Sequence, residues 1–223
     1  MYGGNAQPAA NKCGRPDGPG GFSPNQQISQ GIEYMTMCNT MLRPAVFLDR
    51  DGTIIEDRGY LSCLSQVVFF DDTVPALQKL QAHFDLFIVT NQSGVARKLI
   101  TPEDVVRVNR HVLSHLARSG IRIVETYVCP HARHDDCRCM KPKPYFLRKA
   151  ETDHQVDLAR SFVLGDHPHD VTFGENAGAK GIYLLTGHGE KHLSEVAEGT
   201  TIVHDIRDAV ELILGKLEKL GSE

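Results

Sequence analysis

The 223-residue sequence lacks the features that define several common classes of protein. No apolar run approaches the roughly 20 residues of a membrane-spanning helix, so we expect no membrane partner. No basic segment leads into an apolar one near the start, which predicts that there is no secretory signal. The formal net charge is −4, whereas nucleic-acid binders usually carry a basic face, so we expect no nucleic-acid partner.

The sequence also lacks an even spread of cysteines that would suggest a disulfide framework. Of its six cysteines, three are scattered, at positions 13, 38 and 63, and three cluster around His131. Clustered cysteines with a histidine, in a chain without an export signal, favour a metal site over disulfides. We therefore expect a cytoplasmic protein.

What is present divides the chain into two parts. Residues 1–31 are rich in Gly, Pro, Asn, Gln and Ala and cannot bury enough apolar surface to offset the entropy of ordering. We predict a disordered N-terminal tail over 1–40 and one domain over 41–223.

From Pro44 onward, short aliphatic runs alternate with helical patterns, which predicts an α/β fold with a Rossmann-like parallel sheet and helices on both faces. Strands are predicted near 44–49, 85–90, 121–128, 161–165 and 180–185. Helices are predicted near 73–83, 101–119, 143–154, 170–178 and 205–219, with Thr101 as an N-cap. Residues 54–70 form the predicted flap over the site, and no large cap domain fits there or between Gly94 and Lys141.

Two carboxylates, Asp49 and Asp51, follow the apolar run 45–48. In an open parallel sheet, ligands bind at the carboxyl ends of the strands. The simpler alternative is a strand followed by an ordinary turn at Asp51-Gly52.

Two further polar segments follow predicted strands. Thr90-Asn91-Gln92-Ser93-Gly94 offers hydroxyl, amide and backbone donors that suit phosphate oxygens, and its alternative is a polar loop that caps a helix. Gly165-Asp166 places another acid at a strand end, and Asp170 is a candidate N-cap.

The cysteine cluster reads Cys129-Pro-His131, five residues, then Cys137-Arg-Cys139. Three thiolates and one imidazole complete a closed tetrahedral zinc site, which predicts structural Zn²⁺. His134 is an alternative ligand, although His131 matches the paired spacing better. Lys141 follows this loop, and its ammonium suits a phosphate group.

Together these motifs closely resemble the haloacid dehalogenase superfamily of phosphohydrolases. Its four motifs occur in order, as listed here: Asp49-Arg50-Asp51-Gly52-Thr53, Thr90, Lys141, and Gly165-Asp166 with Asp170. The zinc loop narrows the resemblance to the branch that contains D-glycero-D-manno-heptose 1,7-bisphosphate phosphatase and histidinol-phosphatase. Two further segments are similar to that branch: Asp57-Arg58-Gly59-Tyr60 and the stretch from Thr90 to Arg97.

The resemblance implies an aspartyl-phosphate mechanism on a small phosphorylated metabolite. Asp49 would be the nucleophile and Asp51 the proton shuttle, while Thr90 and Lys141 would hold the phosphoryl group. Mg²⁺ would be bound by Asp49, Asp166 and the backbone carbonyl of Asp51. The implied substrate-binding residues are Asp57, Arg58, Gly59, Tyr60, Thr90, Asn91, Gln92, Ser93, Met140, Lys141 and His167.

Two positions depart from the branch. Met140 stands where its members with assigned substrates usually carry Arg, and His167 stands where its heptose phosphatases tend to carry Lys, which we expect to exchange a fixed charge for one that titrates near neutrality. A heptose bisphosphate phosphatase is our first hypothesis, and histidinol-phosphatase or another sugar-phosphate phosphatase is the alternative. A catalytically silent, zinc-stabilised phosphate-binding module is the alternative of another class, and a monomer is the expected state.

Overall fold

The computed structural model describes residues 42–220, and it describes side chains for residues 42–217. The predicted tail over 1–40 lies outside these residues. The described strands are β1 (Ala45–Leu48), β2 (Asp85–Asn91), β3 (Ile123–Cys129), β4 (Phe162–Gly165), β5 (Lys180–Leu184) and β6 (Thr201–Val203). The described α-helices are α1 (Thr73–Leu80), α2 (Pro102–Arg118), α3 (Tyr145–His154), α4 (Pro168–Glu175), α5 (Gly189–His192) and α6 (Ile206–Leu220).

The six strands form one parallel sheet in the order β3-β2-β1-β4-β5-β6. The strand order reverses between β1 and β4, which pair along Val46–Leu48 and Phe162–Leu164. In open α/β sheets this switch point opens a crevice beyond the carboxyl ends of the strands. The predicted Rossmann-like α/β fold is thus confirmed.

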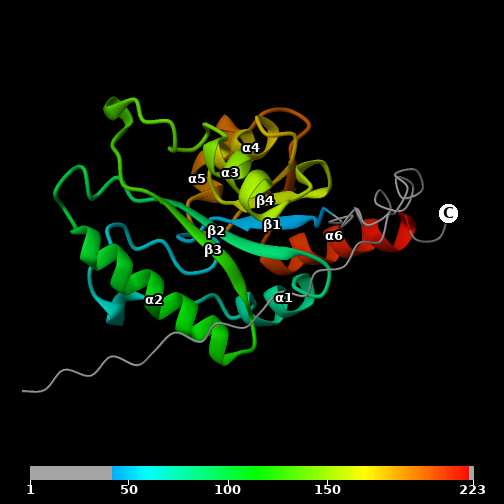
Figure 1. Ribbon diagram of the computed structural model, residues 1–223, viewed down its shortest axis with the longest axis horizontal. Helices are drawn as coiled ribbons and strands as arrows, with labels where there is room; N and C mark the ends of the chain where they lie inside the picture. Colours follow the sequence, from blue (N-terminus) through cyan, green and yellow to red (C-terminus); the bar gives the residue numbers. More distant parts are fainter. Residues whose placement is uncertain (1–41, 221–223) are drawn as a thin grey trace, which may run out of the picture. The chain divides into compact units, whose positions relative to one another are not determined.

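Helices cover both faces of the sheet, with α1, α2 and α6 on one face and α3 and α4 on the other (Figure 1). All four residues of β1 are fully buried, as expected of a central parallel strand. Val46 and Leu48 pack into the core under the first face, while Ala45 and Phe47 pack into the core under the second. This alternation places β1 in the middle of the sheet, so the residues that follow it lie at the centre of its carboxyl edge.

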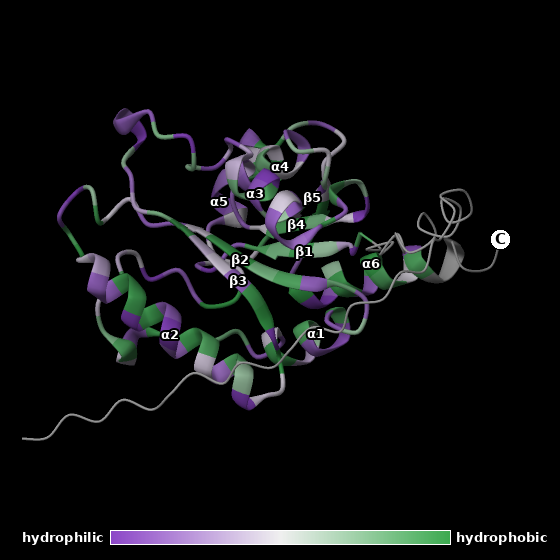
Figure 2. Ribbon diagram, in the orientation of Figure 1, coloured by the Kyte–Doolittle hydropathy of each residue, from purple (hydrophilic) through white to green (hydrophobic). Residues whose placement is uncertain are grey.

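Helix α2 shows how local sequence determines an element. Its N-cap, Thr101, accepts a hydrogen bond from the backbone N–H of Asp104 at 3.1 Å, and the Asp104 carboxylate accepts one from the backbone N–H of Thr101 at 2.9 Å. The predicted stripe of Val105, Val108, Val112 and Leu116 is buried against the sheet. Figure 2 shows apolar and polar segments alternating along the ribbon of α2, as expected of a helix with one buried face.

The structure differs from the predictions in three local features. Strand β6 was not predicted, because it has only three residues and none of them is buried. The helix α5, which has four residues, was not predicted either. The alternative that Asp170 is an N-cap is wrong: His167 is the N-cap of α4, and Asp170 lies three residues later, where its carboxylate accepts a hydrogen bond from the His167 N–H at 3.1 Å.

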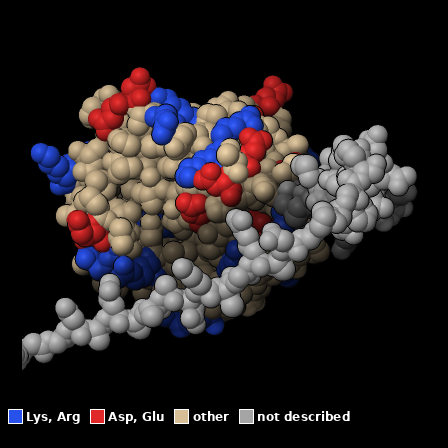
Figure 3. All heavy atoms as spheres, in the orientation of Figure 1, with Lys and Arg blue, Asp and Glu red and all other residues tan. Residues whose placement is uncertain are grey.

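The segment between β1 and α1 contains no cap domain, as predicted. It contains one short 3-10 turn, η1 (Leu64–Gln66), and an isolated bridge between Ile55 and Phe69. None of the described helices combines the length and apolarity needed to cross a membrane. Basic and acidic side chains are interspersed over the face shown in Figure 3.

Candidate active site

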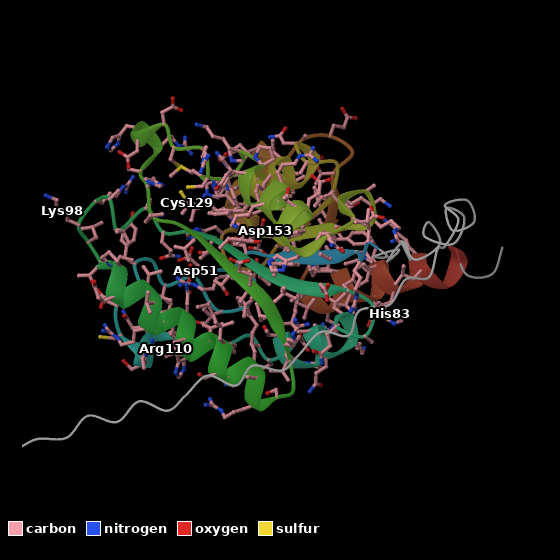
Figure 4. The ribbon with its side chains drawn as sticks, in the orientation of Figure 1. Asp51, His83, Lys98, Arg110, Cys129 and Asp153 are labelled. Atoms are coloured by element: carbon pink, nitrogen blue, oxygen red, sulfur yellow. The ribbon has the colours of Figure 1, made fainter. Side chains whose placement is uncertain are left out.

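The predicted acids and donors converge at the switch point of the sheet. Asp49 follows β1, Thr90 lies at the end of β2, Asp166 follows β4, and Lys141 arrives from the loop after β3. Figure 4 labels Asp51, which follows β1, and Cys129, which ends β3. A cleft of about 480 Å³ opens here, lined by Asp49, Asn91, Ser93, Arg97, Arg133, Met140, Lys141, His167, His169 and Asp170.

Lys141 is the charged centre of the cleft. Its side chain is 5% exposed and forms ion pairs with Asp49 and with Asp170, the latter at 2.5 Å, and it donates a hydrogen bond to the Val89 carbonyl at 3.0 Å. Burial opposes its charge, but the carboxylates of Asp170 and Asp49 outweigh burial and raise the pKa of Lys141. The ammonium is therefore permanently charged next to Asp49.

The acids around Lys141 carry more negative charge than one ammonium neutralises. Burial raises the pKa of Asp49 well above its usual range, against the attraction of Lys141, and Asp170 and Asp166 raise it further. Burial, followed by the charge of Asp170, raises the pKa of Asp166 to about 7. Such a crowded donor set of carboxylate oxygens fits a divalent cation, because the cation would offset their mutual repulsion.

Two glycines make room for Asp166. A Cβ atom at Gly52 would lie 2.0 Å from an Asp166 carboxylate oxygen, and one at Gly187 would lie 2.2 Å from the same oxygen. Both glycines have positive φ values, of 84° and 55°. The backbone N–H of His188 donates to this carboxylate at 2.7 Å, which fixes its orientation.

Asp51 is held by the side chain of Arg50, for which the sequence predicted no role. Arg50 is 1% exposed, and its Nε and Nη2 atoms donate to both Asp51 oxygens at 2.8–3.2 Å. Its Nη1 donates to the side chain of Asn109 in α2 at 2.7 Å. No pattern in the sequence distinguishes this arginine from an exposed one, so its partner could not be predicted.

The polar turn after β2 contributes side chains that hold one another. The Gln92 amide donates to Asp51 and to the Thr90 hydroxyl, both at 2.8 Å, and the Asn91 amide oxygen accepts from the Lys141 N–H at 3.3 Å. Asn91 and Ser93 line the cleft, whereas Thr90 is buried behind it.

The predicted substrate-binding residues of the flap do not line the cleft itself. Asp57 pairs with His188 at 3.4 Å and accepts from the Gly59 N–H at 2.7 Å, while Arg58 forms an exposed ion pair with Glu56. Tyr60 reaches the edge of the site, where its hydroxyl accepts a hydrogen bond from Arg97 at 2.9 Å.

His167 and Met140 line the cleft. The expectation that His167 titrates near neutrality is wrong. Burial and the neighbouring His169 lower the pKa of His167 to about 4. The imidazole is therefore neutral at physiological pH, so position 167 supplies no cation.

The four predicted zinc ligands lie together at the end of β3. The sulfur atoms of Cys129, Cys137 and Cys139 are 3.4–3.7 Å apart, and the Nδ1 atom of His131 lies 3.3 Å from the Cys139 sulfur. A tetrahedral site with zinc–sulfur bonds of about 2.3 Å places its sulfur atoms about 3.8 Å apart, so this donor set fits zinc. His134 is exposed and interacts with Asp135 instead, which leaves His131 as the imidazole of the cluster.

The pKa of one of these thiols, that of Cys137, is lowered, which favours the thiolate form that binds a metal. Burial raises the pKa of the Cys137 thiol, but the backbone N–H groups of Cys139 and Met140 outweigh burial and lower it. Burial raises the pKa of Cys129 and of Cys139. Metal binding would therefore deprotonate two thiols that otherwise stay neutral.

Comparisons with known proteins agree with this geometry. A family model described as HAD-hydrolase-like matches residues 138–209. The chain is 34% identical over 187 residues to D-glycero-beta-D-manno-heptose-1,7-bisphosphate 7-phosphatase of Pasteurella multocida, covering 78% of this chain and 98% of that protein. It is 34% identical over 154 residues to the histidine biosynthesis bifunctional protein HisB of Actinobacillus pleuropneumoniae, covering 68% of this chain and 42% of that protein. Among solved structures, D,D-heptose 1,7-bisphosphate phosphatase from B. bronchiseptica, complexed with magnesium and phosphate, matches with a TM-score of 0.72 and 28% identity over 78% of this chain and 99% of that one.

The parallel sheet and the acids at its switch point define a phosphatase with a haloacid dehalogenase-like fold. The chain belongs to the haloacid dehalogenase-like hydrolases, in the branch that includes the D-glycero-D-manno-heptose 1,7-bisphosphate phosphatases.

Proposed function

We propose that this phosphatase is Mg²⁺-dependent and hydrolyses a small sugar phosphate through an aspartyl-phosphate on Asp49. One observation carries the proposal: Asp49 lies in the cleft at the end of β1, in an ion pair with the buried Lys141. A carboxylate oxygen is thereby presented at the floor of the cleft, with a fixed positive charge beside it for the phosphoryl group.

The reaction would proceed in two displacements. A carboxylate oxygen of Asp49 attacks phosphorus, and the substrate alkoxide leaves with a proton from Asp51. Asp51 then takes a proton from a water molecule, whose oxygen attacks the same phosphorus and releases the Asp49 carboxylate and inorganic phosphate. The hydroxyl of Thr90 and the ammonium of Lys141 would hold the phosphoryl oxygens during both steps.

Asp49, Asp166 and the backbone carbonyl of Asp51 would hold Mg²⁺, which supplies charge neutralisation for a phosphate dianion among carboxylates. The raised pKa values of Asp49 and Asp166 support this assignment, because they reflect negative charge that Lys141 does not balance. The cysteine cluster would hold a structural Zn²⁺ and so fix the loop that carries Lys141.

Among substrates, D-glycero-D-manno-heptose 1,7-bisphosphate is the first candidate, because the relative from Pasteurella multocida carries that name and matches along almost its whole length. Histidinol phosphate is the second candidate, favoured by the resemblance of the sequence to the branch that contains histidinol-phosphatase and by the match to HisB. The reduced cysteines that a zinc site requires support a cytoplasmic protein, and we propose that it is a monomer.

The test is phosphate release from heptose bisphosphate, histidinol phosphate and common sugar phosphates, with Mg²⁺ and with a chelator in its place. We expect turnover with Mg²⁺ and none with the variant Asp49→Asn, which retains the shape of the side chain. A folded wild-type protein that binds phosphate but releases none from any of these esters would instead support the catalytically silent module. An unchanged rate in Asp49→Asn would exclude the proposed nucleophile.

A further inference from the structure

Two arginines that the proposed chemistry does not use line the same cleft as Asp49. Arg97 comes from the turn after β2, and Arg133 begins the short 3-10 turn η2 (Arg133–Asp135) inside the cysteine loop. Within residues 42–217, neither guanidinium forms an ion pair, although most other arginines in this part of the chain do. The acids of the cleft, Asp49 and Asp170, are already paired with Lys141.

A chain of hydrogen bonds orients Arg133. The Nδ1 atom of His167 accepts from the backbone N–H of His169 at 3.3 Å, so it carries no proton, and the 2.8 Å contact between the two Nδ1 atoms then requires a proton on Nδ1 of His169. In neutral His169 the Nε2 atom is consequently an acceptor, and it lies 3.3 Å from Nη2 of Arg133. His169 is thus a positioning residue that holds one nitrogen of the guanidinium and leaves the others free.

Arg97 is oriented by a residue of the flap, Tyr60. Its Nη1 atom donates to the Tyr60 hydroxyl at 2.9 Å, and the ring of Tyr60 lies directly over Gly94, where a Cβ atom would be 2.4 Å away. Tyr60 accepts one hydrogen bond and leaves the remaining donors of Arg97 unused. Both arginines are therefore held by neutral partners that do not cancel their charge.

The pairing of the other charges in the cleft shows why this matters. Met140 lines the cleft with a thioether, which carries no charge. Lys141 lines it too, but its ammonium is already paired with Asp49 and Asp170. Arg133 and Arg97 are therefore the lining cations that remain for an anionic group of the substrate.

We propose that Arg133 and Arg97 bind a second phosphate group of the substrate at the rim of the cleft, while Asp49 attacks the first. A guanidinium offers two parallel N–H donors that match two phosphate oxygens, and a pair of such groups suits a dianion. The inference rests on the proposed function and narrows its substrate class to bisphosphates. Histidinol phosphate, which carries an ammonium group and no second phosphate, would be disfavoured by the same two charges.

The experiment compares heptose 1,7-bisphosphate with heptose 7-phosphate as substrates of the full chain loaded with Mg²⁺. For Arg133→Met we expect kcat/KM to fall about 10- to 100-fold more for the bisphosphate than for the monophosphate, the loss typical of a charge-assisted hydrogen bond. Arg133→Lys keeps the charge without the paired donors, so its kcat/KM for the bisphosphate should fall less than that of Arg133→Met. Lys98→Met is the control, because it removes a positive charge next to Arg97 in the sequence that does not line the cleft and lies at the outer end of its loop in Figure 4. It should change neither value.

A second measurement does not depend on turnover. Titration calorimetry with Asp49→Asn protein should show the bisphosphate binding more tightly than the monophosphate, and the added Arg133→Met change should remove that difference. Equal losses for the two ligands, or none, in a variant with normal zinc content would overturn the second phosphate site. If the wild-type protein hydrolyses no phosphate ester, the proposed function fails, and the titration still decides whether the second site exists.

Discussion

The Arg50 guanidinium and the Asp51 carboxylate form a paired interaction, in which two nitrogens donate to both oxygens at 2.8–3.2 Å. The two residues are adjacent in the sequence, and Arg50 is buried while Asp51 reaches the site. The proton shuttle of the proposed mechanism is thus held in one orientation by its own neighbour, which is in turn fixed to α2 through Asn109.

We expect Arg50→Met to impair both stability and turnover. Removing one partner of a buried ion pair leaves the other charge uncompensated, so unfolding free energy should fall by roughly 3 kcal/mol. In the protein that remains folded, kcat should fall at least about tenfold, because Asp51 loses its orientation for proton transfer. Urea unfolding and steady-state kinetics measure the two effects. Asn109→Ala removes only the outer contact and should give a smaller change in both; an unchanged kcat in Arg50→Met would show that Asp51 needs no such support.

Removal of the predicted zinc should destabilise the loop that carries Lys141. We expect Cys137→Ser to lower the zinc content from about one equivalent and to lower the midpoint of thermal unfolding, because metal binding is coupled to folding of its site. Cys63→Ser is the control, since this exposed thiol lies outside the cluster. Elemental analysis with a thermal melt gives both quantities, and a metal-free wild-type protein of normal stability would rule out the closed zinc site.

The strand ends were the predictable part of this protein, whereas contacts made by single side chains were not. Short apolar runs before Asp49, Thr90 and Asp166 predicted where parallel strands stop, and the rule that ligands bind at that edge then brought these residues together. The position of Arg133 depends on the backbone conformation of the cysteine loop, and no local sequence pattern predicts that conformation. His167 was misjudged because its pKa depends on burial and on His169, which only the folded chain places next to it.

Gly94 allows the flap to close over the polar turn. A Cβ atom there would lie 2.4 Å from Cδ1 of Tyr60, so Gly94→Ala must displace the ring and its hydrogen bond with Arg97. We expect KM to rise several-fold with a smaller change in kcat, because the displaced groups border the cleft and do not touch the reacting atoms. In the control, Gly215→Ala, a Cβ meets no atom within 4 Å, and alanine should stabilise α6 by up to about 1 kcal/mol. A wild-type KM in folded Gly94→Ala protein would mean that Tyr60 does not shape the site.

Asp166 should make the metal-free protein less stable as the pH rises. Its pKa is about 7 in the folded protein and near 3.8 when unperturbed, so between these values the folded state binds more protons than the unfolded state. Stability contributed by the protonated carboxyl is therefore present below about pH 4 and is lost as the pH rises to about 7. Asp166→Asn keeps an oxygen that can accept from the His188 N–H and removes the titration. It should therefore be more stable than the wild type by at least about 1 kcal/mol at pH 7, and the difference should be smaller at pH 4.5. Urea unfolding in a chelator at pH 4.5 and pH 7 measures this change.

The same variant, Asp166→Asn, should lose Mg²⁺-dependent turnover. Added Mg²⁺ should raise the unfolding midpoint of the wild type but not that of Asp166→Asn. This difference distinguishes a ligand of the cation from an acid that is merely buried.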